Sequence, residues 1–109
     1  MQHDRLEAMT KGWFVGNFTP SVLKTDQFEV AVKHYKAGDH EPAHFHAKAT
    51  EITAIVSGRV RMCGADWSAG DVLTITPGET TDFLALTAAT TVVVKTPSLT
   101  DDKFVAEDS

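Results

Sequence analysis

The chain has 109 residues, of which 42% are hydrophobic and 23% charged, as in one ordinary globular domain. Its net charge of −5 and the absence of a basic stripe argue against nucleic-acid binding. The apolar runs are too short for a membrane span, and the charged N-terminal segment lacks the apolar core of a secretory signal. A single cysteine, Cys63, excludes an internal disulfide and fits a reducing compartment. We therefore expect a soluble, cytoplasmic protein that binds neither nucleic acid nor membrane.

Turn residues interrupt the chain at short intervals, and the segments between them are rich in Val, Ile, Thr and Phe. Such spacing favours an all-β sandwich or barrel. After one or two helical turns near residues 3–10, we expect strands at residues 12–18, 27–36, 43–46, 50–57, 59–63, 71–76, 81–87 and 90–96. We expect one domain over residues 1–109, with a barrel core at about 12–97. The acidic tail at 98–109 is expected to fray or to dock loosely through Phe104 and Val105.

The expected strand at residues 27–36 alternates, which places Phe28, Val30, Val32 and His34 on one face. Because the first three are apolar, we expect this face to point into the barrel and His34 to line its pocket. A histidine that is satisfied within the core is the alternative to a catalytic role for His34.

The expected strand at residues 50–57 carries different side chains on its two faces. Glu51, Thr53 and Ile55 share one face, and Ile52 and Val56 share the other. A strand with apolar residues on both faces is covered on both sides. We expect Thr53 to line the pocket beside Glu51, and a second subunit to cover the opposite face, which predicts a homodimer.

Two histidines and a glutamate have the spacing of metal ligands. Residues two apart on a strand point to the same side, so His44 and His46 project together. The four residues that follow allow a tight turn, after which Glu51 can meet the two imidazoles. Two neutral imidazoles and one carboxylate suit Zn, Fe, Mn, Ni or Cu and leave coordination positions open. A polar cluster without metal is the alternative.

The stretch around these residues resembles the first motif of the cupin family. That motif is a Gly, five residues, His-x-His, three or four residues, Glu, six residues and Gly. The sequence matches it at Gly38, His44, His46, Glu51 and Gly58. The resemblance covers roughly residues 27–96 and implies a jelly-roll barrel, the double-stranded β-helix, with the metal inside.

Residues 70–83 resemble the second cupin motif but depart from it at an important position. Where cupins usually supply a further histidine ligand, this chain has Thr81. The resemblance therefore implies a site reduced to His44, His46 and Glu51, with Thr81 as a pocket-lining hydroxyl or, less favourably, a ligand. Glu79 is an alternative ligand because strand alternation places it on the side of Thr81.

Two functions of different classes fit the sequence. In the first, an enzyme uses the metal and the open positions to act on a small oxygen-rich ligand. In the second, a non-catalytic binding or regulatory module holds a small ligand, with or without metal. The sequence does not choose between them. The segment from Lys11 to Phe18 looks similar to stand-alone cupins of sugar-nucleotide and surface-polysaccharide pathways, which points to a sugar or sugar nucleotide as ligand.

Overall fold

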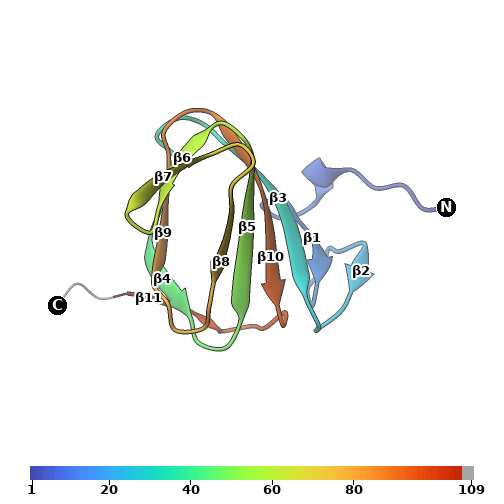
Figure 1. The fold of residues 1–109 in the computed structure, drawn as a ribbon. Coiled ribbons are helices and arrows are strands. Elements are labelled where there is room, and N and C mark those ends of the chain that lie inside the picture. The colour runs from blue at the N-terminus through green and yellow to red at the C-terminus, as the bar shows by residue number, and fades with distance from the viewer. Residues whose placement is uncertain (107–109) are drawn as a thin grey trace.

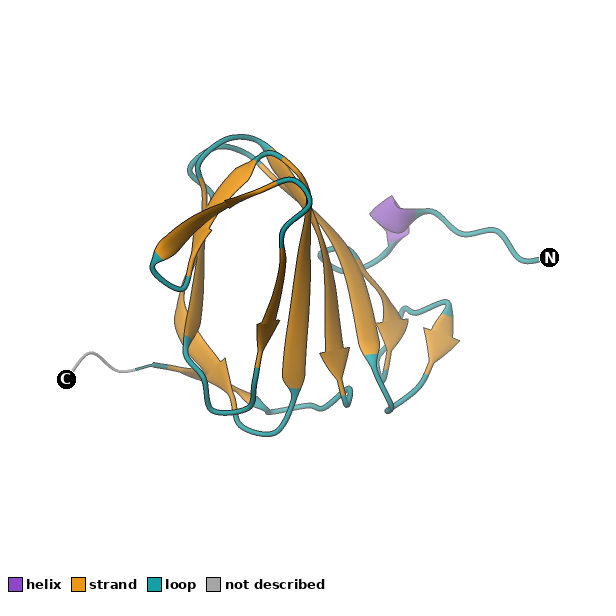
Figure 2. Ribbon diagram, in the orientation of Figure 1, coloured by secondary structure: helices purple, strands orange, loops and turns teal. Residues whose placement is uncertain are grey.

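The computed structural model describes residues 1–106 and consists mainly of strands (Figures 1 and 2). One short 3-10 helix, η1 (Leu6–Ala8), lies in the N-terminal segment where helical turns were expected. The strands are β1 (Trp13–Gly16), β2 (Leu23–Lys24), β3 (Glu29–Tyr35), β4 (His40–His46), β5 (Thr50–Ser57), β6 (Arg59–Met62), β7 (Ala65–Ser68), β8 (Val72–Ile75), β9 (Thr81–Ala85), β10 (Ala89–Thr96) and β11 (Lys103–Val105). Among residues 1–106, no helix is long and apolar enough to cross a membrane.

The strands form two sheets that face each other (Figure 1). The six-stranded sheet has the order β2-β1-β3-β10-β5-β8, and the five-stranded sheet has the order β11-β4-β9-β6-β7. The chain passes between the sheets at several points, including the turn between β4 and β5. This arrangement confirms the predicted all-β jelly-roll, or double-stranded β-helix, architecture.

Each of the eight predicted strands is present, but three short strands were not predicted. The pair β6–β7 is a hairpin in which Met62 lies opposite Ala65. Its two turn residues, Cys63 and Gly64, have φ values of 53° and 79°, as the tight turns of two-residue hairpins require. Residues 65–68 were missed because their sequence resembles that of a turn.

The C-terminal strand β11 was also missed. It pairs with β4 in register, so that Lys103 lies opposite His46 and Phe104 opposite Phe45. The rings of Phe45 and Phe104 stack with their centroids 5.5 Å apart. The tail therefore docks through Phe104 as expected, but as an ordered edge strand beside the predicted metal ligands. Glu107 and Asp108 of the acidic tail lie outside the described residues.

The apolar core fills part of the space between the sheets. Its buried side chains come from both sheets and are Ile55, Val60, Met62, Ile75, Phe83, Ala85 and Ala89. The partly buried side chains of Tyr35, Trp67 and Leu73 pack against them. The turn from β5 into β6 requires the motif glycine Gly58, where φ is +84° and a Cβ would lie 2.1 Å from the carbonyl oxygen of Ala88. Gly58 therefore allows β5 to turn into the opposite sheet.

The prediction that His34 points into the barrel is wrong. On β3 the inward positions are held by Ala31, which is fully buried, and by Lys33 and Tyr35, which line the cavity. His34 is exposed on the outer face, where its Nδ1 lies 3.1 Å from Oγ1 of Thr90 on β10. The apolar face of β3 was taken for the interior, but in this fold the apolar face is the outer one.

The outer face of the six-stranded sheet is apolar across four strands. Neighbouring strands place apolar residues opposite one another in two cross-strand rows: Val32, Val92, Ala54 and Val72 in one, and Val30, Val94 and Ile52 in the other. On β5 the alternation is as predicted, because Glu51, Thr53 and Ile55 are buried while Ile52 and Val56 face outward.

Candidate metal centre

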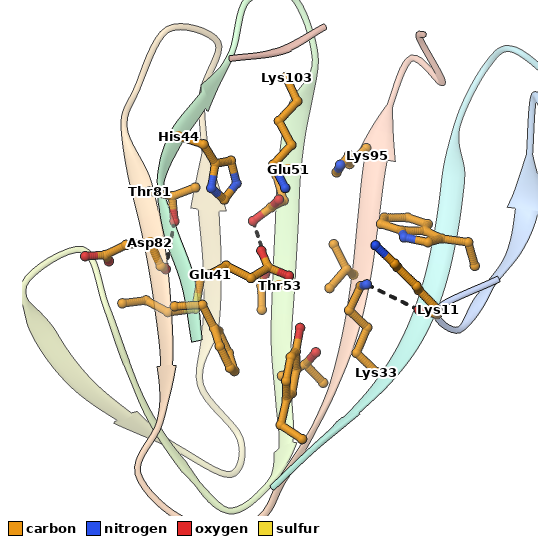
Figure 3. A pocket seen from close by; sticks show the side chains of 16 residues that line it. Lys11, Lys33, Glu41, His44, Glu51, Thr53, Thr81, Asp82, Lys95 and Lys103 are labelled. Atoms are coloured by element: carbon orange, nitrogen blue, oxygen red, sulfur yellow. Dashed lines mark hydrogen bonds between the residues drawn. The ribbon is translucent and has the colours of Figure 1, made fainter. Parts of the chain in front are cut away.

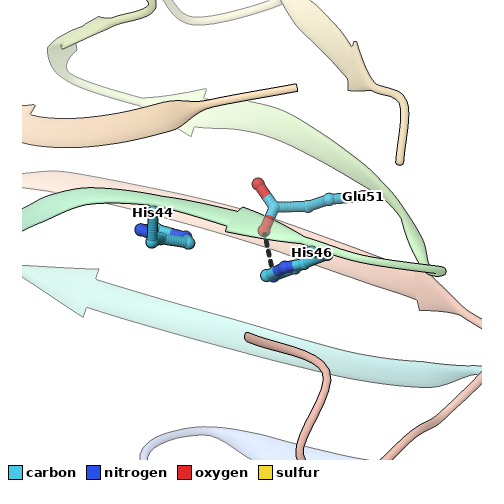
Figure 4. Close-up of side chains that lie close together, drawn as sticks. All are labelled: His44, His46 and Glu51. Carbon is cyan, nitrogen blue, oxygen red and sulfur yellow. Dashed lines mark ion pairs between the residues drawn. The ribbon is translucent and has the colours of Figure 1, made fainter. Parts of the chain in front are cut away.

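The two histidines and the glutamate of the first motif come together at the end of the barrel where β4 leads into β5 (Figure 4). His44 and His46 lie at the end of β4, and Glu51 is the second residue of β5 in the opposite sheet. The three residues are only 4%, 6% and 8% exposed. One ligand atom from each lies within 4.8 Å of the others. The structure thus brings together the three residues that the sequence spacing selected.

A backbone hydrogen bond sets the orientation of the His44 ring. Its Nδ1 lies 2.8 Å from the carbonyl oxygen of Pro42. A carbonyl oxygen only accepts, so Nδ1 carries the proton and donates it. In the neutral ring, Nε2 then keeps its lone pair free, which is the arrangement found in most metal-bound histidines.

His46 has no hydrogen-bond partner for either ring nitrogen among the described residues, although both atoms are buried. Its Nε2 lies 3.8 Å from Oε1 of Glu51, which is too long for a hydrogen bond. Burial, with smaller contributions from Lys95 and His44, lowers the pKa of His46 to about 4. A buried, neutral imidazole without a partner is costly unless something binds it. A divalent ion between His46, His44 and Glu51 fits this requirement.

Glu51 is held in place by Thr53, its neighbour on the same face of β5. The hydroxyl of Thr53 donates to Oε2 of Glu51 over 3.1 Å, while Oε1 is the oxygen nearer His46. The donor set is therefore two imidazole nitrogens and one oriented carboxylate, which suits a borderline divalent metal and leaves positions open.

Thr81 occupies the place next to the histidines that the second motif predicted. It starts β9 and lies opposite His44 in the register of β4 and β9. Its hydroxyl donates to the carbonyl of Asp82 over 3.3 Å and lies 3.5 Å from Sγ of Cys63. Glu79 is exposed and is not among the clustered ligand residues. Among the described residues, no further His, Cys, Asp or Glu joins this cluster.

A cavity of about 270 Å³ lies between the sheets beside this cluster (Figure 3). His44, Glu51, Thr53 and Thr81 are among the residues that line it. His46 faces a neighbouring hollow of about 280 Å³.

Sequence reasoning missed the cationic lining of the cavity. Lys11, Lys33, Lys95 and Lys103 all line it. Alternation along β3 groups Lys33 with Ala31 and Tyr35, and this signal would have identified Lys33 if the inner face of that strand had been assigned correctly. Lys103 could not be found because β11 itself was not predicted.

No family model and no curated protein matches the sequence. The structure, however, resembles many solved ones. An uncharacterized conserved protein with a double-stranded β-helix domain from Klebsiella pneumoniae is 22% identical, with a TM-score of 0.72, over 80% of this chain and 76% of that one. A sugar phosphate isomerase of the cupin superfamily from Silicibacter pomeroyi is 22% identical, with a TM-score of 0.68, over 75% and 58%.

A bacterial pirin from Escherichia coli, solved in complex with nickel(II), is 19% identical, with a TM-score of 0.68, over 83% of this chain and 40% of that one. These likenesses define the class of the fold, which is a double-stranded β-helix. More particularly, the protein has the fold of a small cupin.

Proposed function

We propose that this protein is a cupin of one domain that binds a divalent metal through His44, His46 and Glu51. The open coordination positions then bind a small oxygen-rich ligand in the adjoining cavity. The observation that carries the proposal is the convergence of these three buried side chains, with the ring nitrogens of His46 left without any other partner. The nickel(II) complex of the Escherichia coli pirin supports a transition metal, and Zn, Fe, Mn, Ni and Cu all suit the donor set.

The size of the cavity limits the ligand. A volume of about 270 Å³ corresponds to roughly nine water molecules, enough for a compact sugar-sized molecule. The nucleotide portion of a sugar nucleotide would have to extend beyond it. The similarity to a sugar phosphate isomerase supports a sugar-like ligand.

Metal-dependent catalysis is the first candidate function. A bound divalent ion would polarise an oxygen of the ligand or lower the pKa of a bound water. The protein's own groups would exclude water and orient the ligand. A non-catalytic binding module is the second candidate, and the Thr81 hydroxyl favours it. Its proton is directed to the carbonyl of Asp82 rather than into the cavity, so it is poorly placed to transfer a proton.

Elemental analysis of the purified protein, followed by calorimetric titration of the chelator-treated protein with Zn²⁺, Ni²⁺ and Mn²⁺, tests the metal site. We expect one ion per chain in the wild type and loss of binding in His46→Ala. His34→Ala is the matched control because His34 is exposed on the outer face, and it should bind as the wild type does. A wild type that is metal-free and has no affinity for any of these ions near neutral pH would refute the proposal.

Turnover separates the two candidate functions. A metal-dependent enzyme converts a sugar or sugar acid in at least one metal form and loses that turnover in His46→Ala. A binding module binds the same compounds with no turnover in any metal form.

The proposal includes a homodimer that covers the outer face of the six-stranded sheet. That face carries no charged side chain on the outward positions of β5, β8 and β10, and its apolar rows are partly exposed in the single chain. A two-fold pairing of such a face with a second copy is the commonest way to bury it.

A further inference from the structure

Lysines gather around the cavity although the chain as a whole is acidic. Four of its seven lysines line this one cavity, while its net charge is −5. They come from four separate segments: Lys11 precedes β1, Lys33 lies on β3, Lys95 on β10 and Lys103 on β11. Their convergence is therefore a product of the fold and not of one basic run in the sequence.

These lysines form no direct ion pair among the described residues. None of the four ammonium groups lies within 4.0 Å of a carboxylate in the part of the chain that the structure describes, where the ion pairs involve other residues. The carboxylates that line the same cavity are Glu41, Glu51 and Asp82. Glu51 accepts a hydrogen bond from Thr53 and Asp82 accepts one from the backbone of Cys63, so these two are oriented by partners other than the lysines.

The lysines also repel one another. Burial lowers the pKa of Lys33, and the nearby charges of Lys95, Lys11 and Lys103 lower it further, against the opposing effect of Glu41. Like charges held together in a partly buried site raise the free energy of the empty protein. A bound anion removes that cost and gains charge-assisted hydrogen bonds.

Trp13 holds two of these lysines on one side of the cavity. The Nζ atoms of Lys33 and Lys95 lie 5.2 Å and 4.9 Å from the centroid of its ring, close enough for cation–π attraction. Nζ of Lys33 also donates to the carbonyl oxygen of Lys11 over 3.2 Å. The two ammonium groups are therefore positioned before any ligand arrives.

The cavity has two chemically different walls (Figure 3). Lys11, Lys33 and Lys95 lie on the side of β3 and β10, whereas His44 and Thr81 lie on the side of β4 and β9. Glu51 lies opposite Lys95 in the register of β5 and β10, and Lys103 lies opposite His46 on β11. A ligand between the walls therefore meets Lys33 and Lys95 on one side and His44 on the other, with Glu51 next to Lys95.

We propose that the ligand of this cavity is a small oxyanion with a carboxylate or phosphate group. Lys33 and Lys95 bind that group, while a hydroxyl or carbonyl oxygen of the same ligand faces the cluster of His44, His46 and Glu51. The metal-facing half of this inference rests on the proposed function. The anion-binding half stands on the lysines alone. A carboxylate and a phosphate share the chemistry that these ammonium groups recognise, and the two are distinguished by experiment.

Calorimetry with three probes, D-glycerate, inorganic phosphate and neutral glycerol, tests the inference on the zinc-loaded and the chelator-treated protein. We expect D-glycerate to bind the zinc-loaded protein and glycerol not to bind. Tighter binding of phosphate than of D-glycerate would identify the anion as phosphate, and the reverse order would identify it as carboxylate. Equal binding of glycerol and D-glycerate overturns the proposal.

The double variant Lys33→Gln/Lys95→Gln should bind the preferred anion about a hundredfold more weakly, since each of the two lost charge-assisted hydrogen bonds contributes about tenfold. The control Lys24→Gln/Lys36→Gln removes the same charge from exposed positions away from the cavity and should bind as the wild type does. Lys33→Arg/Lys95→Arg keeps the charge and should retain binding even if the glutamine variant folds poorly. Unchanged binding in a folded Lys33→Gln/Lys95→Gln protein contradicts the inference.

The metal titration keeps the two proposals separate. Zinc should bind Lys33→Gln/Lys95→Gln at least as tightly as the wild type, because positive charge has been removed near the ion. If the wild type binds no metal but the chelator-treated protein still binds the anion through these lysines, the metal site fails and the anion site stands. If the protein binds zinc but none of the anions, the metal site stands and the anion site is refuted.

Discussion

Thr81 is the residue that most distinguishes this barrel from the cupin pattern that its sequence otherwise follows. It lies opposite His44 in the strand register, where a further imidazole would complete the ligand set. We expect Thr81→His to raise the affinity for Zn²⁺ by about tenfold or more, corresponding to about 1.4 kcal/mol. Competition with a chromogenic chelator measures the change.

Thr81→Val is the control for this prediction. It removes the hydroxyl but keeps the shape, so Zn²⁺ affinity should remain at the wild-type level if the hydroxyl is not a ligand. A fall in affinity for Thr81→Val would instead assign the hydroxyl to the metal. A Thr81→His protein with unchanged affinity would contradict the expectation that an imidazole at this position binds the ion.

Tyr35 is the only tyrosine of the chain, and it makes a pH-dependent prediction possible. Burial, with the nearby negative charges of Glu41 and Glu51, raises its pKa in the folded state well above the ordinary value. In the unfolded chain it ionises near a pH of about 10. The folded state thus keeps the proton that the unfolded state loses, so its contribution to stability is complete below about pH 10 and decreases as the pH rises further.

An ultraviolet titration of tyrosinate absorbance measures this effect. The signal should stay absent in the folded protein beyond about pH 10 and should appear together with alkaline unfolding. Tyr35→Phe should give no signal. A tyrosinate signal near pH 10 in protein that circular dichroism shows to be folded would disprove the prediction.

Some residues of the site could be predicted from the sequence and others could not. His44, His46 and Glu51 could be predicted because their spacing alone requires one strand, one turn and the next strand. His34 and Lys33 could not be assigned correctly because the choice depends on which face of β3 is interior. Hydropathy selects the more apolar face, and in this barrel that face is on the outside while a lysine points inward.

At the scale of elements, β11 and the residue before it hold the loop between the metal-binding strands. The carboxylate of Asp102 accepts hydrogen bonds from the backbone N–H groups of Lys48 and Ala49 at 2.9 and 3.0 Å. This loop carries the chain from His46 to Glu51, so the tail sets the distance between two of the ligands.

We expect Asp102→Asn to destabilise the protein by about 1–3 kcal/mol, because the NH2 group of the amide replaces one of the two acceptor oxygens and faces a backbone N–H. We expect the substitution to weaken zinc binding as well. Urea unfolding and metal titration measure the two effects. Asp101→Asn removes the same charge next door on an exposed side chain and should change neither. Equal effects of the two substitutions would show that charge, not the loop contact, is responsible.

The strands were predicted unevenly for a physical reason. Long strands that bury one face, such as β5 and β10, reveal themselves by alternation and by β-branched residues. The short strands β2, β7 and β11 have two to four residues and contain too little of either signal. Their pairing depends on neighbours that are distant in sequence, such as β4 for β11.

At the scale of the whole molecule, the apolar outer face predicts the oligomeric state. Val56 on β5 and Val72 on β8 both belong to this face and are 54% and 63% exposed in the single chain. We expect a dimer in sedimentation-equilibrium experiments. Val56→Lys/Val72→Lys should convert it to a folded monomer, because burying two charges on such an interface is costly.

Val105 provides the control for this experiment. It is 70% exposed on β11 of the opposite sheet, so Val105→Lys should leave the dimer intact. A wild type that sediments as a monomer at all accessible concentrations would remove the homodimer from the proposal.

The placement of the three ligands on different sheets has a mechanical consequence. His44 and His46 belong to the five-stranded sheet and Glu51 to the six-stranded one. An ion bound by all three therefore cross-links the two sheets of the barrel. Separating the sheets then requires breaking coordination bonds, so the unfolding temperature reports how much of the protein has metal bound. It should rise in proportion to the logarithm of free zinc above the dissociation constant, whichever reaction the barrel performs, and His46→Ala should abolish the dependence.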